Sequence, residues 1–354
     1  MHDLSATTTW GFAGLLGAMI LTLALEEKLH AKKSMITGFF AVTALLAGTA
    51  MHLLPFGELT LPNGHPVSMP VFIPAVDWGV ITIILGASLF VDVVSRSGIF
   101  TWTAIKLTKL SGGDPFKLLV AYGGLTVGFS AVLNNVTAMI IVGSLTAVSL
   151  GKLERKDLML GFLLTEGLLT NIGGLLTLIS SVPNIILGNL AGIPFMKFFY
   201  VAAPYTLVAT AVTIGMSVLI FGIRPVIDPA AKKAAAELVA SFDENDAIES
   251  NAFFGISWVM LGLFIATIAG ASVLPWVNEL GMGFVAMAWA VIAMIRYKHD
   301  VDKNYAAFDW DLLFFFIYLF IVINVMEHAG VLDLIGHFIG TLIDLGDYAG
   351  SAAL

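Results

Sequence analysis

Long apolar stretches recur along the chain and are separated by short polar or charged segments. They lie at residues 9–25, 35–54, 78–95, 116–150, 158–190, 198–222, 252–271, 279–295 and 310–326. Most reach the roughly 20 residues that a helix needs to cross the hydrocarbon layer, whereas the strands of a membrane barrel are short and alternate. The pattern therefore predicts an all-α polytopic membrane protein.

Composition agrees with this prediction. Hydrophobic residues make up 58% of the 354 residues and charged residues only 12%, which is too little polar surface to coat a soluble globule. The formal net charge of −8 argues against a nucleic-acid partner, and the absence of cysteine excludes disulfides and thiolate chemistry. We expect the lipid bilayer to surround the chain.

Basic residues predict the orientation of the chain. The start, MHDLSATTTWG, lacks the positive region of a signal peptide, so we expect the first helix to be retained. Lysines at 28, 32 and 33 follow that helix, and loop 55–75 has no Lys or Arg. Under the positive-inside rule the N-terminus lies outside, and we expect the cell membrane as the location.

The same rule predicts a cytoplasmic position for four further basic clusters. They are Arg96, Lys106 and Lys109; Lys152, Arg155 and Lys156; Arg224, Lys232 and Lys233; and Arg296, Lys298 and Lys303. The assignment requires residues 116–150 to enter from the cytoplasm and return to it. A re-entrant hairpin with Asn134 and Asn135 at its tip meets this requirement, because the arm 136–150 is short for a full crossing.

The sequence contains an internal repeat. Residues 76–110 align without gaps on residues 308–342 at an offset of 232, so that Asp-Trp at 77 matches Asp-Trp at 309 and Gly98 matches Gly330. Because the charge rule gives the two copies opposite orientations, we expect inverted repeats, as in secondary transporters. The predicted parts are N-terminal scaffold helices (1–75), a first repeat (76–223), a cytoplasmic linker (224–250) and a second repeat (251–354). The position equivalent to Asn134 would be 366, so we expect a truncated chain whose second repeat is incomplete.

The hairpin tip lies in the stretch SAVLNNVTAMIIVGSLTAVSLG, residues 130–151, where two amides sit in an apolar run. A helix broken at membrane depth leaves backbone groups that lipid cannot satisfy, so such breaks lie beside buried polar groups or a wet cavity. The side chains of Asn134 and Asn135 can bind an anion or help to cage a sodium ion. The alternative is that they only form hydrogen bonds between helices; two amides at a break favour the binding site.

A second break is predicted in TEGLLTNIGGLLTLISSVPNIILG, residues 165–188. Gly173 and Gly174 permit unwound or closely packed backbone, and Ser181 with Pro183 indicates a serine cap and a new helix start. Close helix packing through small residues is the alternative. The polar content favours a cavity wall, formed by Thr170, Asn171, Thr177, Ser180, Ser181 and Asn184.

Two acidic residues lie inside apolar runs. Glu166 and Asp92 must each be paired, protonated or functional. The sequence has no HExxH motif, phosphate loop or nucleophile and base arrangement. We therefore expect no enzyme and no cofactor, with a sodium ion at Asn135 and Asn171 as the one candidate metal.

These two stretches resemble the ion-transporter superfamily, in the branch of arsenite permeases, NhaD-type sodium/proton antiporters and the melanosomal P protein, with divalent anion/sodium symporters as more distant relatives. The hairpin is similar to an Asp-Asn-Val-Thr motif, in which Asn135 and Thr137 match and Asn134 replaces the acid. The second stretch is similar to a pattern matched at Glu166, Asn171, Gly173, Gly174, Thr177, Pro183 and Asn184. It departs at Ser180, Ser181 and Val182, where Ser181 again replaces an acid.

The resemblance implies an elevator-type movement of the hairpin and broken helix past a fixed scaffold, commonly in a homodimer. With two acids replaced, we expect a secondary active transporter of a small inorganic or organic anion, coupled to sodium or protons. The expected site comprises Asn134, Asn135, Thr137, Asn171, Gly173, Gly174, Ser181 and Asn184, with Glu166 and Asp92 as candidates for coupling. The alternative is sodium/proton antiport, and a more distant one is an intramembrane enzyme or a non-transporting subunit.

Overall fold

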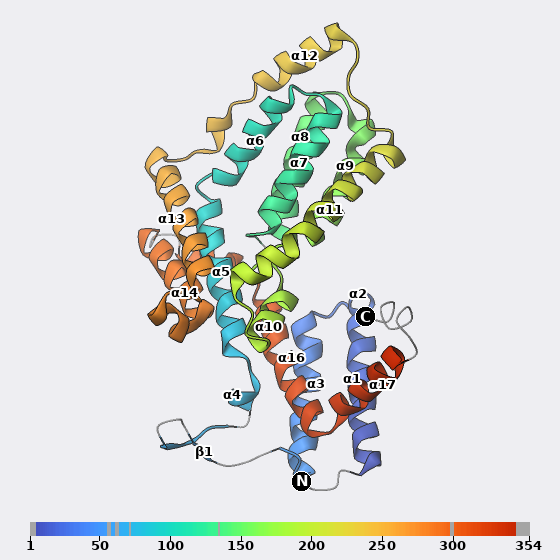
Figure 1. Cartoon of the computed structure of the whole chain (residues 1–354), viewed down its shortest axis with the longest axis vertical. Coiled ribbons are helices and arrows are strands. Elements are labelled where there is room, and N and C mark those ends of the chain that lie inside the picture. Colours follow the sequence, from blue (N-terminus) through green and yellow to red (C-terminus); the bar gives the residue numbers. More distant parts are fainter. Residues whose placement is uncertain are drawn as a thin grey trace. The chain divides into compact units, whose positions relative to one another are not determined.

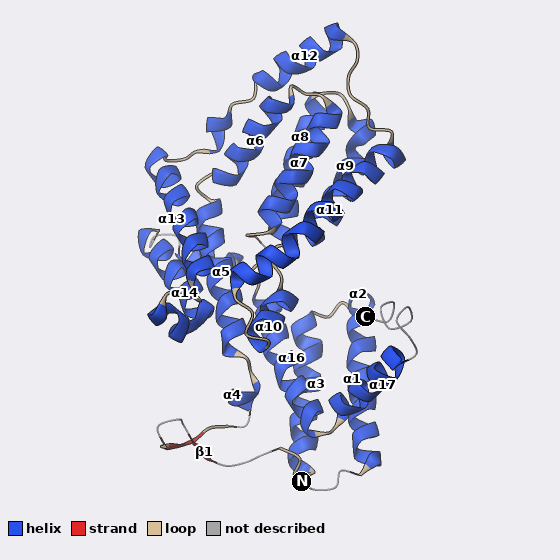
Figure 2. Ribbon diagram, in the orientation of Figure 1, coloured by secondary structure: helices blue, strands red, loops and turns tan. Residues whose placement is uncertain are grey.

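A computed structural model describes residues 5–54, 58–60, 64–70, 72–133, 135–297 and 301–344. Helices dominate these residues, and the strands β1 (Glu58–Thr60) and β2 (Pro66–Ser68) form an antiparallel pair (Figure 2). Seven of the described helices are long and apolar enough to cross a membrane. They are α1 (Ala6–Ala24), α3 (Lys33–Ala50), α5 (Trp78–Ser95), α11 (Phe195–Phe221), α13 (Asn251–Gly270), most of α14 (Pro275–Arg296) and α16 (Trp310–His328). The prediction of an all-α polytopic membrane protein is confirmed.

The chain forms two compact units, which we describe separately. Unit 1 comprises Met1–Ile81 and Asp309–Leu354. In it α16 packs along α3, and α1 packs on α3 and on α17 (Val331–Asp344) (Figure 1). A Cβ at Gly38 would lie 3.0 Å from the ring of Tyr318, so small residues on α3 allow α16 to approach closely. The short helices α2 (Glu26–Leu29) and α4 (Phe72–Ala75) complete this unit.

Unit 2 comprises Thr82–Phe308 and contains both predicted helix breaks. Its central helix is α9 (Met159–Gly174), which packs against α7 (Pro115–Ser130), α8 (Asn135–Lys152) and α11 (Figure 1). Fully buried side chains, among them Tyr122, Leu118, Phe162 and Leu169, fill the space between these helices. The remaining elements are most of α5, α6 (Ile99–Ser111), the 3₁₀ turn η1 (Lys156–Leu158), α10 (Val182–Leu190), α12 (Pro229–Ala240), the 3₁₀ turn η2 (Glu244–Ala247), α13, α14 and α15 (Val301–Ala307).

The two segments that align in sequence have the same local fold. Each begins with an aspartate, Asp77 or Asp309, whose carboxylate accepts a hydrogen bond from the backbone N–H three residues later. A helix follows, α5 or α16, and then a glycine in the left-handed region, Gly98 at φ 82° or Gly330 at φ 72°. A second helix, α6 or α17, begins directly after that glycine. The caps and the turns therefore recur at equivalent positions.

The segment 224–250 packs against the ends of several helices of unit 2. The backbone N–H of Val226 donates to the Asp114 carboxylate, 2.9 Å away, at the start of α7. Lys106 and Lys109 of α6 both form ion pairs with Glu244. The ammonium group of Lys152, which ends α8, lies 4.3 Å from the ring of the segment's Phe242. One polar segment thus contacts the end of α6, the start of α7 and the end of α8.

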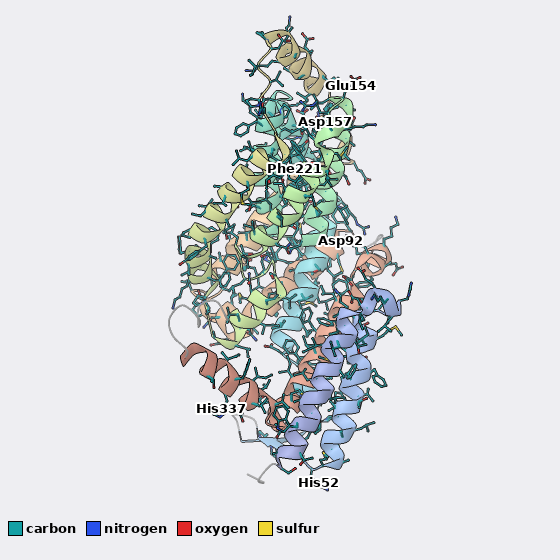
Figure 3. All side chains as sticks on the ribbon, turned by 90° about the vertical axis from the view of Figure 1, so that its right-hand side faces the viewer. His52, Asp92, Glu154, Asp157, Phe221 and His337 are labelled. Atoms are coloured by element: carbon teal, nitrogen blue, oxygen red, sulfur yellow. The ribbon has the colours of Figure 1, made fainter. Side chains whose placement is uncertain are left out.

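Helix α8 ends at Lys152, which contacts Phe242 of segment 224–250. The turn that joins α8 to α9 therefore lies at the end of unit 2 that this segment covers. It carries Glu154 and Asp157, and Figure 3 shows Phe221, at the end of α11, near them. The ring of Phe221 packs on Gly161 in the first turn of α9, where an added Cβ would lie 2.7 Å from the ring. Helix α7 therefore starts at the same end of the unit as the one where helix α8 ends, as the predicted hairpin requires.

The turn at Gly98 gives a first test of this packing. A Cβ at Gly98 would clash with the carbonyl oxygen of Ala247, whereas nothing lies within 4 Å of a Cβ at Gly112, which also has a positive φ. We expect Gly112→Ala to lower the free energy of unfolding by about 1 kcal/mol through backbone strain alone. Gly98→Ala adds a backbone clash and should cost about 1–3 kcal/mol more. Thermal unfolding of the two variants in detergent checks this order, and equal midpoints would contradict the contact.

The ion pairs of Glu244 predict a pH dependence. Hydrogen bonds from Lys109, from the backbone and from Lys106 lower the pKa of Glu244 from 4.5 to about 2. Because the folded pKa is the lower one, the stabilisation is fully present above pH 4.5 and is lost as the pH falls towards 2. Hydrogen exchange across 224–250, corrected for its intrinsic pH dependence, should show easier opening within that window. The variant Glu244→Gln should open with no such pH dependence; a matching acid transition in it would contradict the prediction.

Candidate functional site

The first break joins α7 to α8 at the predicted position. Helix α7 begins after the capping residue Asp114, which accepts from the N–H of Lys117, and ends at Ser130. Helix α8 begins at Asn135. Asn134 lies outside the described residues, so its predicted role stays a prediction. Asn135 occupies the first turn of α8, where backbone N–H groups lack partners within the helix.

The second break divides the stretch after Glu166 into two helices. Helix α9 ends at Gly174 and α10 begins at Val182, which leaves residues 175–181 outside a helix. The predicted helix stop and new start are therefore confirmed. Ser181 occupies the N-cap position with Pro183 in the first turn, but its side chain forms no capping hydrogen bond. The expected serine cap is wrong in this respect.

Side chains satisfy the carbonyl groups that the second break releases. The hydroxyl of Ser180 lies 2.8 Å from the carbonyl oxygen of Gly174 and 3.1 Å from that of Thr177. The amide of Asn184 donates to the same two oxygens, at 2.9 and 3.0 Å. Asn184 is itself buried. Its observed role is therefore to hold the unwound backbone in place of the missing helical N–H donors.

Further hydrogen bonds tie the two breaks together. The hydroxyl of Ser130 lies 2.8 Å from the side-chain oxygen of Asn135 and 2.6 Å from the carbonyl oxygen of Thr170. The amide nitrogen of Asn135 donates to the side-chain oxygen of Asn171 over 3.2 Å. From the other side, Thr177 donates to the carbonyl oxygen of Ala131 over 2.6 Å. The hairpin tip and the unwound segment thus form one bonded assembly.

Two glycines let the helices approach closely enough for these bonds. A Cβ at Gly173 would lie 2.7 Å from the carbonyl oxygen of Val127 on α7 and 2.9 Å from the Cβ of Ser130. A Cβ at Gly174 would lie 2.9 Å from the side-chain oxygen of Asn135. Both glycines remain helical, so their role here is close packing. An alanine at either position would occupy space that the hairpin already fills.

The predicted site residues differ in accessibility. Asn171 is exposed, and Asn135, Thr137 and Ser181 are half-buried. Each asparagine amide has two N–H donors, and the bonds from Asn135 to Asn171 and from Asn171 to the Gly167 carbonyl engage one donor of each. The accessible edge of the site therefore presents amide groups, while the glycines and Asn184 form its buried wall.

The two acidic candidates for coupling lie in different environments. Glu166 is fully buried on α9, one and a half turns before Asn171, and accepts a hydrogen bond from Thr146 at 2.5 Å. Its second carboxylate oxygen, Oε2, has no hydrogen-bond partner among the described residues. Asp92 lies on α5 (Figure 3). It pairs with Arg96 at 3.0 Å, and both side chains are about one-third exposed. A local ion pair therefore accounts for Asp92.

Sequence reasoning missed two residues that the structure places at the site, Ser130 and Thr146. Ser130 is the last residue of α7, a position from which a hydroxyl can reach the tip, so a signal was available. The described residues contain no group of three His, Cys, Asp or Glu side chains that could hold a metal ion. For a sodium ion to bind the side-chain oxygens of Asn135 and Asn171, it would have to replace the hydrogen bonds that these oxygens now accept.

Helices long enough to span a bilayer define an integral membrane protein, and polar helix breaks of this kind are typical of membrane transporters. Comparison with known proteins gives the family. The family model described as "Citrate transporter" (CitMHS) matches residues 35–354. The chain belongs to this family, within the ion-transporter superfamily.

Individual relatives agree with this assignment. An uncharacterized transporter of Mycobacterium tuberculosis is 27% identical over 259 residues, which cover 73% of this chain and 58% of the relative. A 46 kDa membrane protein of Mycobacterium leprae is 28% identical over 268 residues, covering 75% and 60%. An arsenical pump membrane protein of Escherichia coli is 24% identical over 284 residues, covering 77% and 62%. The chain thus spans about three-fifths of the length of these relatives.

The close contact at Gly173 predicts different effects for two alanine substitutions on α9. Gly173→Ala places a methyl group against the backbone of α7, which cannot move like a side chain, so we expect a loss of about 1–3 kcal/mol in unfolding free energy. Gly167 has open space around its Cβ position, and Gly167→Ala should stabilise by up to about 1 kcal/mol through helix propensity. Unfolding midpoints in detergent measure both, and a stabilising Gly173→Ala would rule out the contact.

Proposed function

We propose that the protein is a secondary active transporter of a small anion, with an organic polycarboxylate of the citrate type as the substrate and sodium or protons as the coupling ion. One observation carries the proposal: two helix breaks in unit 2 are bonded to each other and present the amides of Asn135 and Asn171 at an accessible edge. Membership of the citrate transporter family supports an anionic substrate.

The chemistry of the site suits a carboxylate. Amide N–H groups and the backbone N–H groups that open α8 and α10 donate hydrogen bonds, and helix N-termini favour negative charge. Asn134 and Ser181 stand where the resembling motifs carry acids, which removes two groups that would repel an anion. Because some relatives are named as arsenical pumps, an inorganic oxyanion is the second substrate class to test.

The remaining expectations belong to the same proposal. The recurring aspartate, helix, glycine and helix pattern supports two repeats, for which we propose inverted orientation. The basic residues gathered at the end covered by 224–250 support a cytoplasmic position for that end. The lysines at 28, 32 and 33, which follow the first helix, support an outside N-terminus, and we propose the cell membrane as the location. An elevator movement of the bonded hairpin and broken helix, within a homodimer, completes the proposed mechanism.

Sodium/proton antiport remains the alternative function. The observation that favours it is Glu166, a fully buried carboxyl group with one oxygen that has no hydrogen-bond partner among the described residues. Antiport predicts proton movement that depends on sodium without any anion and that disappears in Glu166→Gln. No observation favours the more distant proposals of an intramembrane enzyme or a non-transporting subunit.

Uptake into liposomes tests the proposed function. Labelled citrate, succinate and arsenate should be offered with an imposed sodium or pH gradient. We expect uptake of citrate, and a loss of about ten-fold or more in Asn135→Ala or Asn171→Ala, because each removal takes a donor from the bound anion and leaves its partner unpaired. The matched control is Asn189→Ala, on an exposed position of α10, which should transport like the unchanged protein.

The results separate the candidates. Uptake of arsenate alone would replace the organic anion by an inorganic one as the substrate. A response to sodium and pH with no anion uptake would establish antiport. Citrate uptake that neither asparagine substitution affects would show that Asn135 and Asn171 do not bind the substrate.

A further inference from the structure

Buried hydroxyl groups follow one face of α7. Tyr122, Thr126 and Ser130 occur at intervals of four residues and are fully buried. This spacing places them one above another along the helix. Ser130 belongs to the hairpin tip described above, so the row leads from the site towards the start of α7. A transmembrane helix could fill such positions with Leu or Ala, and hydroxyl groups there require partners.

Tyr122 is the centre of a hydrogen-bonded chain across three helices. Its hydroxyl lies 2.6 Å from that of Thr108 on α6 and 2.8 Å from that of Ser149 on α8. All three side chains are fully buried. Thr108 lies one turn before Ser111, and Asp114 follows at the end of unit 2 where segment 224–250 packs. The chain therefore starts close to the polar end of the unit.

The inner end of the chain points towards Glu166. Thr146, which donates to Oε1 of Glu166, precedes Ser149 by three residues on α8, so the two hydroxyl groups lie on neighbouring turns of one face. The oxygen Oε2 of Glu166 is buried and has no hydrogen-bond partner among the described residues. An acceptor in that position is expected either to bind a proton or to meet a polar group that arrives during function.

We propose that Thr108, Tyr122, Ser149 and Thr146 form a proton path between the polar end of unit 2 and Glu166. At each step a hydroxyl oxygen accepts a proton and releases its own hydrogen to the next oxygen. A side-chain rotation on α8 bridges the step between Ser149 and Thr146, and Oε1 of Glu166, which the Thr146 hydroxyl faces, receives the last proton. The return of the proton reverses every step, so no other reactant is needed. The inference rests on the proposed function, because a proton that reaches Glu166 arrives about one and a half helical turns from Asn171 and couples to the anion site.

Few other ionisable groups surround Glu166. Between Lys117 and Lys152 the elements α7 and α8 contribute only Tyr122. Helix α11, which also packs on α9, carries Lys197, Tyr200 and Tyr205 in its first half, and the turn η1 carries Lys156 and Asp157. The path therefore depends on hydroxyl groups, and the loss of a single one should interrupt it.

A pH-jump experiment on the protein in liposomes tests the path. Infrared spectroscopy follows the carboxyl band that Glu166→Gln removes. Tyr122→Phe deletes the central hydroxyl and keeps the ring, so we expect the band to respond at least about ten-fold more slowly and to reach the same final amplitude. The matched control, Tyr205→Phe, alters a tyrosine that is 75% exposed and should respond at the original rate.

Ser149→Ala serves as a second interruption in case Tyr122→Phe does not fold, which the unfolding midpoint would show. An original rate in both variants, or a band that survives Glu166→Gln, would overturn the inference. Parallel citrate uptake separates this failure from that of the proposed function. If the carboxyl band responds more slowly in Tyr122→Phe and no citrate is taken up by the unchanged protein, the path stands and transport of citrate is refuted. If citrate uptake is normal and the band responds at the unchanged protein's rate in both variants, the path alone is refuted.

Discussion

A helix that stops inside a membrane releases backbone carbonyl groups, and lipid offers them no hydrogen-bond donor. In unit 2 this constraint is met at the second break by Ser180 and Asn184, which both donate to the carbonyl oxygens of Gly174 and Thr177. Without these donors, residues 175–181 would be more stable as a continuous helix, because the helix would satisfy their backbone groups. The unwound segment depends on side-chain donors that take the place of backbone N–H donors. The shape of the candidate site depends on the same donors.

Side-chain donors to free backbone carbonyl groups also connect the two breaks. The carbonyl oxygens of Ala131 and Thr170 accept hydrogen bonds from Thr177 and Ser130, so each break supplies donors to the other. Gly173 lets the helices come close enough for this exchange. The result is a neutral polar assembly inside an apolar protein, which can accept an anion without first burying a charge of its own.

Much of this could be predicted from the sequence, because local signals carry it. The amides at 134 and 135, Gly-Gly at 173 and Ser-Val-Pro at 181 mark the breaks where the structure has them, and the repeat at an offset of 232 recurs as matching caps and turns. The pairing of donors and acceptors could not be predicted, since it depends on how helices rotate against one another. Thr146 was missed for this reason, whereas the position of Ser130 just before the hairpin tip was a signal that could have been used.

The two acids illustrate the same limit. Sequence alone places both Glu166 and Asp92 in apolar runs. Asp92 has Arg96 four residues later and pairs with it along its own helix, whereas among the described residues Glu166 has Thr146, on another helix, as its one side-chain hydrogen-bond partner. Hydrophobicity cannot distinguish these cases, but packing can. The structure therefore leaves Glu166 as the acid whose environment calls for a functional explanation.

Hydrogen exchange with and without citrate tests the central claim, that the hairpin tip and the helix break form one anion site. The account predicts that citrate slows exchange jointly in residues 127–137 and 171–184, while 224–250 exchanges at an unchanged rate. Protection of one segment without the other, or of neither while citrate is transported, would contradict it.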